Sequence, residues 1–204
     1  MNHFIRVCLV FIASALAFTF PSLSFSHPHV FIENTVIMVF DKQGLSGVRV
    51  KWVFDEFFSS MIAGDYDRNH NNRFENNEIK TIKDKAFANL ANYAYFTFIK
   101  VDGRPFKVKY VRDFSATLTK SKLTYRFFIP CHVKAASSFK NMRISQYDPT
   151  YYTRVAFGKT RPVSFEGNSR FEIHFRLAKN LKEAYYFGQI HPHEIILKFR
   201  QKNG

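Results

Sequence analysis

Hydrophobic and polar residues alternate along most of this chain with a period of two, the pattern of half-buried β-strands. In residues 48–54 the apolar side chains occupy every second position, and Arg49 and Lys51 lie between them. Residues 30–40 form a longer β-branched and aromatic run, which ends at a turn sequence over residues 41–44. The same criteria predict further strands at residues 96–101, 106–111, 114–118, 123–129, 142–147, 153–157, 162–166, 171–177 and 194–199.

Turn sequences separate these strands. Asp102 and Gly103 favour the left-handed backbone conformations of a two-residue β-hairpin. The polar residues 119–122 predict a second tight connection between neighbouring strands. Residues 180–189 show no clear period and are expected to form a loop or a short helix.

The hydrophobic period changes between residues 55 and 95. Residues 55–63 fit a short helix with acidic residues in its first turn, where the helix dipole favours negative charge. A second helix is predicted from about residue 76 to 95, because its apolar residues recur at steps of three and four, namely Ile79, Ile82, Ala86, Leu90 and Tyr93. We therefore predict an α+β protein of mainly antiparallel, β-sandwich-like sheets with one EF-hand-like helix–loop–helix insertion at about 55–95.

The first 26 residues have the three parts of a secretory signal peptide. The start of the chain contains Arg6, residues 7–20 are apolar, and residues 24–26 follow the small–x–small cleavage pattern. This apolar run is shorter than the ~20 residues of a membrane span, although an uncleaved anchor is an alternative. We expect residues 1–26 to be removed on export to the periplasm, leaving a single soluble domain of residues 27–204.

The composition is strongly basic and moderately apolar. Lys and Arg number 30 against 16 Asp and Glu, a formal net charge of +14, and 46% hydrophobic residues exclude wholesale disorder. A basic protein often binds nucleic acid, but an exported protein does not meet it, so no nucleic-acid partner is predicted. Because the charge is spread along the sequence, a solvated surface is the simplest explanation, with contact to an anionic membrane surface as the alternative.

The segment between the two predicted helices has the spacing of a calcium-binding loop. Counting from residue 67, loop positions one, three, five, seven, nine and twelve are Asp67, Asn69, Asn71, Arg73, Glu75 and Glu78. Ca²⁺ takes six to eight oxygen ligands, which this spacing supplies from carboxylates, amides and the backbone carbonyl of position seven. Phe74, at position eight, is the apolar residue that such loops turn inward.

One position departs from the usual loop, since Asn72 replaces the glycine of position six. Asparagine tolerates the left-handed conformation better than most residues, so the loop remains compatible with calcium. The nearby Arg68, Arg73 and Lys80 predict weak binding, with a dissociation constant on the order of 10⁻⁴–10⁻³ M. The alternative is a solvated polar turn without a metal.

The predicted mature chain begins with His27-Pro28-His29. A free N-terminal histidine offers both an amine and an imidazole, and His29 can add a second imidazole from an extended segment. Pro28 lacks the backbone N–H that the square-planar amino-terminal copper or nickel site needs. What remains is an imidazole-plus-amine site for zinc, nickel, cobalt or copper.

A second His-Pro-His sequence precedes the last predicted strand, with His191 and His193 at the same spacing. If the two segments meet in the fold, four imidazoles can converge on one transition metal. Exposed loop histidines are common, so a role in solvation alone is the competing explanation for both pairs.

Other candidate residues have simpler structural explanations. Cys131 and His132 are neighbours on a strand and so point to opposite faces, which indicates a buried cysteine. Asp55 fits the start of a helix, and Asp148 fits a turn in which it accepts backbone hydrogen bonds. The sequence contains no nucleophile elbow, phosphate loop or zinc-protease motif, so we predict no enzyme activity.

Several motifs in order resemble a bacterial periplasmic family catalogued as domain of unknown function 1007. Over roughly residues 27–166 these motifs are HPHVFIE, VKWVFDEFFSS, DYDRNHNNRFENNEI, NYAYFTFIKVDG, RDF at residues 112–114, and YDPTYY. The resemblance implies a periplasmic component of a transport system, encoded beside nickel/cobalt-type metal permeases or exporters. It supplies no catalytic residue.

Three functions remain open on the sequence. The first is a periplasmic accessory protein that binds nickel, cobalt or zinc for a membrane metal permease or exporter and carries a structural calcium loop. The second is a copper-dependent secreted oxidase or monooxygenase-like enzyme that uses an N-terminal histidine brace. The third is a non-catalytic interaction protein in which Ca²⁺ only stabilises the fold.

Overall fold

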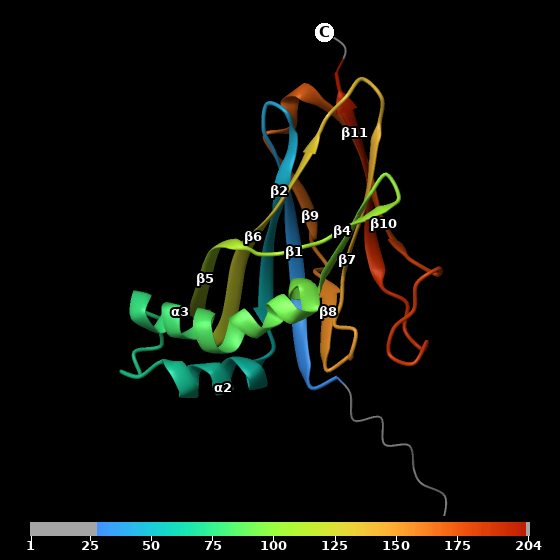
Figure 1. Cartoon of the computed structure of the whole chain (residues 1–204). Coiled ribbons are helices and arrows are strands. Elements are labelled where there is room, and N and C mark those ends of the chain that lie inside the picture. The colour runs from blue at the N-terminus through green and yellow to red at the C-terminus, as the bar shows by residue number, and fades with distance from the viewer. Residues whose placement is uncertain (1–27, 203–204) are drawn as a thin grey trace, which may run out of the picture.

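Two β-sheets pack face to face, and a helical insertion covers the end of one of them, as the computed structural model in Figure 1 shows. The structure describes residues 28–202. The predicted signal peptide, residues 1–26, and His27 lie outside the described residues. The two-sheet α+β architecture predicted from the sequence is confirmed.

The first sheet has the strand order β5-β6-β2-β1-β8, and β9 also pairs with β1. These strands are β1 Val30–Phe40, β2 Gly44–Phe54, β5 Arg112–Thr119, β6 Lys122–Lys134, β8 Thr153–Phe157 and β9 Val163–Glu166. Pairing is antiparallel from β5 to β1, whereas β8 and β9 run parallel to β1. The sheet is mixed at this edge because the chain reaches β8 from the second sheet, and parallel pairing requires such a crossover.

The second sheet has the order β10-β11-β7-β3-β4 and is antiparallel throughout. Its strands are β3 Thr97–Val101, β4 Arg104–Phe106, β7 Lys140–Gln146, β10 Phe171–Lys179 and β11 His193–Gln201. Asp102 and Gly103 both have positive φ in the β3–β4 turn, as a two-residue hairpin requires, so this turn prediction is confirmed.

The strand predicted at residues 106–111 is wrong, because β4 is Arg104–Phe106 and residues 107–111 are irregular. This segment still alternates, since Val108 is buried while Lys107 and Lys109 are exposed. It crosses from the second sheet to β5 of the first (Figure 1). A crossing segment of this kind produces the alternation of a strand without a ladder partner.

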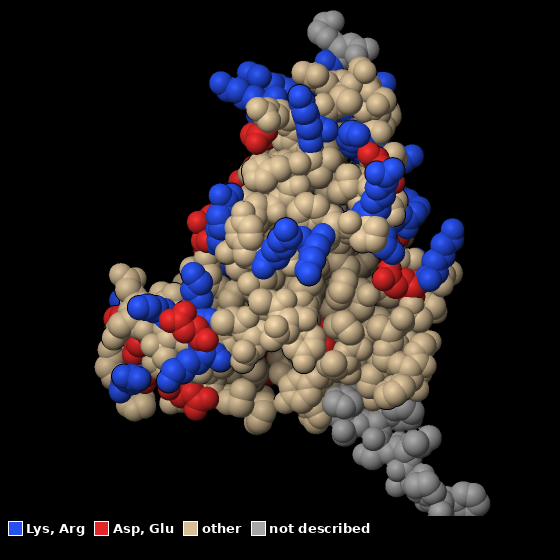
Figure 2. Space-filling model, in the orientation of Figure 1, with Lys and Arg blue, Asp and Glu red and all other residues tan. Residues whose placement is uncertain are grey.

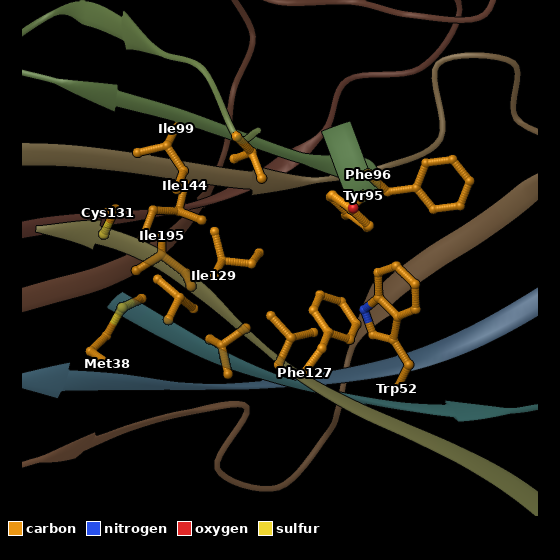
Figure 3. Packing of buried hydrophobic residues seen from close by; sticks show 14 of the residues in the cluster. Met38, Trp52, Tyr95, Phe96, Ile99, Phe127, Ile129, Cys131, Ile144 and Ile195 are labelled. Carbon is orange, nitrogen blue, oxygen red and sulfur yellow. The ribbon is translucent and has the colours of Figure 1, made fainter. Parts of the chain in front are cut away.

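The inward-facing residues of the two sheets form one core, part of which Figure 3 shows. Trp52 and Phe127 project from the first sheet, and Ile144 and Ile195 from the second, and each has less than 2% of its surface exposed. Trp52 and Phe127 contact edge to face, with ring centroids 4.8 Å apart. Burial of large apolar side chains supplies the main stabilisation of the fold.

A buried polar chain joins the two sheets through this core. The Asn34 side-chain amide on β1 donates to Gln146 of β7, whose own amide donates to the Thr97 hydroxyl of β3 at 3.0 Å. All three residues are at least 95% buried. Because a broken hydrogen bond at such depth leaves a desolvated polar atom, this chain fixes how the sheets face one another.

The helical insertion lies between β2 and β3 and begins with α2, Glu56–Tyr66, and α3, Asn76–Ile82. The long second helix predicted at 76–95 is divided, because α3 passes into a π-helical turn, Lys83–Phe87, and then a 3₁₀ segment, Ala88–Phe96. Nine residues of a straight α-helix rotate a side chain by about 180°. Phe87 and Phe96 are both buried, so the chain must leave the regular helix to turn them both inward.

A buried hydrogen bond attaches α2 to the first sheet. The Ser59 hydroxyl, on α2, accepts a hydrogen bond of 3.0 Å from the backbone N–H of Leu123 at the start of β6. Ser59 is fully buried, so the helix is fixed to the sheet and not merely connected to it in sequence.

Charged residues are dispersed over the surface. Figure 2 shows Lys and Arg side chains scattered over one face, and the lower middle of this face, beside the helices, has few charged groups. Within residues 28–202 the chain forms no helix that is both long and apolar enough to cross a membrane.

Candidate functional site

The loop between α2 and α3 is organised by its own acidic residues. Asp67 follows the last residue of α2, and its backbone N–H donates to the Ala63 carbonyl at 2.9 Å. Glu75 and Glu78 form a capping box at the start of α3, in which the side chain of each residue accepts a hydrogen bond from the backbone N–H of the other. The sequence thus ends one helix and begins the next with the predicted first, ninth and twelfth loop positions.

Asp67 holds the middle of the loop. Its Oδ1 accepts from the backbone N–H of Asn71 at 3.2 Å, and its Oδ2 from that of Asn72 at 2.9 Å. Only 4% of Asp67 is exposed. Asn72 has φ of +60°, so asparagine does adopt the left-handed conformation expected at position six.

Glu78 joins the two ends of the loop. Its Oε1 accepts from the Arg68 N–H and its Oε2 from the Glu75 N–H, both at 2.9 Å. It is 4% exposed, as Asp67 is. Phe74 is half-buried against the core, which confirms the predicted inward position. A single carboxylate therefore links residues at the entry and exit of the loop.

The exposed side of the loop contains the amides and Glu75. The Asn71 Nδ2 donates to Glu75 Oε1 at 2.6 Å, and Asn71 Oδ1 accepts from the Arg73 N–H at 2.8 Å. Hydrogen bonding with Glu78, and then with Asn71 and Asn69, lowers the pKa of Glu75 to about 2. This carboxylate stays ionised over the whole range in which the protein is expected to work.

The carboxylates of the loop do not converge on one point. Within residues 28–202, no three His, Cys, Asp or Glu side chains are arranged as a metal-binding group. The side-chain oxygens of Asp67 and Glu78 are instead satisfied by backbone N–H groups. The loop therefore has the donor atoms and the backbone turn that calcium requires, and their convergence requires side-chain movement.

His29 lies at the entrance of β1 and is exposed. Its backbone N–H donates to the Tyr152 carbonyl at 2.9 Å, and its imidazole packs against the Tyr152 ring with centroids 5.0 Å apart. This contact fixes His29 next to the turn that follows β7. His27, the other predicted ligand, is outside the described residues.

The second predicted pair is divided between two environments. The His191 Nδ1 lies 2.8 Å from the Glu183 carbonyl oxygen in the loop between β10 and β11. His193 is exposed at the first position of β11, opposite Lys179 of β10. The carbonyl contact assigns the N–H to Nδ1 of His191 and leaves the lone pair on Nε2, the tautomer common in metal-ligating histidines.

A turn built on Asp148 lies between the two histidine segments. Its carboxylate accepts from the Thr150 and Thr153 N–H groups, both at 2.9 Å, which confirms the turn predicted there. Tyr151 in this turn packs against Tyr185 and Tyr186, with centroids 6.0 and 5.2 Å apart. Both histidine segments therefore border the same end of the molecule (Figure 1), although the described histidines do not meet as a metal-binding group.

Sequence reasoning missed this tyrosine cluster. Residues 180–189 were expected to form a loop or short helix, and they form a loop with an isolated bridge between Tyr185 and Ile190. The sequence did contain one indication of the cluster, since tyrosine pairs occur at both 151–152 and 185–186. A repeated residue type does not reveal that distant segments touch.

The structural explanations of the weaker candidates are confirmed. Cys131 is 4% exposed, and burial raises the pKa of its thiol to about 12, while His132 is exposed on the other face of β6. Asp55 is the N-cap of α2, because its Oδ1 accepts from Phe58 N–H at 2.9 Å. Its Oδ2 accepts from Phe31 N–H at 2.7 Å.

Proteins of related sequence occur in Spirochaeta aurantia and Haemophilus influenzae. The chain is 28% identical over 128 residues to the "Uncharacterized 15.5 kDa protein in trpE 3'region" of Spirochaeta aurantia, covering 63% of this chain and 91% of that protein. It is 24% identical over 148 residues to an "Uncharacterized protein" of Haemophilus influenzae, covering 71% and 69% of the two chains. A family profile matches residues 12–186, from the predicted signal peptide to the tyrosine cluster, and the chain therefore belongs to the family described as "Protein of unknown function (DUF1007)".

Proposed function

We propose that this protein is an exported, non-catalytic accessory that binds a divalent transition metal, nickel, cobalt or zinc, for a membrane metal permease or exporter. Calcium in the loop of residues 67–78 would stabilise the helical insertion. The observation that carries the proposal is the exposed His29 at the entrance of β1, two residues from the predicted N-terminal His27.

The calcium part of the proposal is supported by the chemistry of the loop. Asp67 and Glu78 are buried carboxylates at positions one and twelve, and Asn72 supplies the left-handed turn between them. The carboxylate oxygens now accept hydrogen bonds from backbone N–H groups. Calcium would bind these oxygens in place of the N–H groups, at the cost of breaking those hydrogen bonds. This competition is a physical reason to expect weak binding.

The transition-metal part is supported by the placement of the histidines. His29 is anchored through its backbone, so its imidazole has a defined position while its surface stays accessible. The Nδ1 of His191 is hydrogen-bonded to the Glu183 carbonyl oxygen, so Nε2 is the ring nitrogen that could bind a metal. We propose that His27 and His29 form the primary site and that His191 and His193 contribute from the adjoining loop.

Exposed apolar residues on α2 support an interaction with a partner. Phe57 is 75% exposed and Met61 45% exposed, and they lie one helical turn apart on the same face. An accessory that delivers a metal must contact its transporter, and such a face is suited to that contact.

The test is calorimetric titration of protein exported by its own signal with zinc, nickel, cobalt and copper. We expect stoichiometric binding with a dissociation constant of about 1 μM or tighter, lost in a His27→Ala/His29→Ala variant. A His132→Ala variant, which removes an exposed imidazole on β6, is the matched control and should bind normally. Equal affinities in all three proteins would refute the proposal.

A further inference from the structure

A cavity of about 390 Å³ lies over the edge strand β10 and its neighbour β11 in the second sheet. Figure 1 shows these two strands on the side of the molecule away from the helical insertion. Both charged and apolar side chains line the cavity. None of them belongs to the calcium loop or to the proposed metal site, so the cavity is independent of the proposed function.

Two cationic side chains of the lining are neighbours on the outer face of the sheet. Leu197 of β11 is fully buried in the core, so Ile196 and Lys198 on either side of it point outward. Arg176 of β10 lies opposite Ile196 in the antiparallel register. Arg176 and Lys198 are therefore diagonal neighbours, and side chains of their length can reach a common point.

The positive charge of this pair is not compensated by the protein. Arg176 and Lys198 are both exposed, and neither side chain forms an ion pair or a hydrogen bond with any of residues 28–202. By contrast, Arg143 of β7, which lies opposite Ile196, is paired with Glu194. Neighbouring like charges repel one another, so an anion bound between Arg176 and Lys198 would be stabilised by both.

Glu172, an acidic residue of the lining, is already neutralised. Its Oε1 lies 2.9 Å from His174 Nε2, and its Oε2 accepts a hydrogen bond of 2.7 Å from Arg200 Nε. Hydrogen bonding to His174, and then to Arg200, lowers the pKa of Glu172. The Glu172 carboxylate is thus ionised and occupied by these two partners, and it does not balance the charge of Arg176 and Lys198.

Apolar side chains form the rest of the wall. The Phe139 ring is held by the Arg200 guanidinium, 4.5 Å from its centroid, and by the His174 ring at 5.6 Å. Ile196 is half-buried on the outer face, and Phe175 adds a ring that is 47% exposed. Apolar surface next to unpaired cations suits a ligand that has an apolar body and one anionic group.

We propose that this cavity binds a small organic carboxylate, with its anionic head between Arg176 and Lys198 and its apolar body against Phe139 and Ile196. A planar guanidinium matches a carboxylate with two parallel hydrogen bonds. A doubly charged head would be repelled more strongly by Glu172, so a single negative charge suits the site better. Because the charged groups are exposed to solvent, we expect a dissociation constant on the order of 10⁻⁴ M.

NMR titration of the ¹⁵N-labelled protein, exported by its own signal and kept in EDTA, tests the proposal without any contribution from a transition metal. The probe is 4-butylbenzoate, and the neutral 4-butylbenzyl alcohol is the matched probe. We expect saturable shifts of the β10 and β11 amide signals, with the acid bound about tenfold more tightly than the alcohol. Raising NaCl from about 20 to about 500 mM should weaken only the acid.

Three variants separate this site from general binding of anions to a basic protein. Arg176→Gln/Lys198→Gln should bind the acid about tenfold more weakly, at the level of the alcohol, and should bind the alcohol normally. Lys107→Gln/Lys109→Gln removes the same charge from exposed residues elsewhere and should bind both probes as the unsubstituted protein does. Ile196→Glu places a carboxylate in the cavity and should abolish binding of the acid.

Circular dichroism establishes which variants are folded before binding is compared. If Ile196→Glu does not fold, Phe139→Ala replaces it, and the loss of this apolar wall should weaken both probes. Equal affinity of the unsubstituted protein for acid and alcohol, or no saturable shift in β10 and β11, would overturn the proposal. So would a loss of acid binding in Lys107→Gln/Lys109→Gln as large as that in Arg176→Gln/Lys198→Gln, or unchanged binding of the acid to folded Ile196→Glu.

Discussion

The substitution Glu78→Gln tests the loop between α2 and α3. Glu78 accepts two backbone hydrogen bonds, from Arg68 and Glu75, and also occupies the twelfth position of the proposed calcium loop. Glutamine has nearly the same shape, but its NH₂ group cannot accept, so one N–H loses its partner. The change therefore removes a charge and one buried hydrogen bond without removing the side chain.

The expected magnitude follows from these two contacts. In metal-free buffer the lost charge-assisted bond should lower the free energy of unfolding by about 2 kcal/mol, which lowers the melting temperature by about 4 to 8 °C in a domain of this size. A site with a dissociation constant of 10⁻⁴–10⁻³ M would stabilise the unsubstituted protein by about 1.4 to 2.7 kcal/mol in about 10 mM Ca²⁺. The corresponding rise in melting temperature is about 3 to 11 °C.

Differential scanning calorimetry measures both effects. Each protein is melted in EGTA, in CaCl₂ and in MgCl₂ at equal ionic strength, with Glu56→Gln as the matched control because Glu56 is exposed on α2. Calcium should raise the melting temperature of the unsubstituted protein and of Glu56→Gln, and should leave Glu78→Gln unchanged. If calcium raises all three equally, or none, the loop is a polar turn and the calcium assignment is wrong.

Three further predictions concern stability and reactivity. The pKa of Glu75 is about 2 in the folded protein against 4.5 ordinarily, so its stabilising contribution is complete above about pH 4.5 and is lost as the pH falls toward 2; the melting temperatures of Glu75→Gln and the unsubstituted protein should therefore converge on acidification. Cys131 has a pKa of about 12, so in a chain that begins at residue 27 it should resist Ellman's reagent when folded and react at once in urea; rapid reaction of the folded protein would contradict its burial. Gly167 has φ of +69°, and an added Cβ would lie 2.2 Å from the Phe40 carbonyl oxygen, so Gly167→Ala should lower the free energy of unfolding by about 2 kcal/mol or more. Gly64→Ala meets nothing within 4 Å and should raise it by up to about 1 kcal/mol; urea denaturation compares the two.

Local patterns predicted the local structure well. The run from Val30 to Phe40 became β1 with unchanged bounds, and Asp102-Gly103 forms the predicted hairpin turn. The backbone conformation of the loop was also predicted correctly, because Asn72 adopts the left-handed conformation and Glu78 links the two ends of the loop. In each case the determinant is a residue's own conformational preference or a partner a few positions away.

Contacts between distant segments were not predictable in this way. The parallel pairing of β1 with β8 depends on a crossover between sheets, which leaves no period in either strand. The division of the second helix follows from burying both Phe87 and Phe96, which requires knowledge of the sheet beneath them. The cavity over β10 and β11 is formed by segments from residue 139 to residue 198, so no local motif marks it.

Native mass spectrometry of the protein exported by its own signal and purified without chelator would show both its first residue and any metal it retains. We predict a chain that begins at His27 and retains one transition-metal ion, which the His27→Ala/His29→Ala variant lacks. A chain that begins elsewhere, or a transition metal retained equally by the variant, would contradict it.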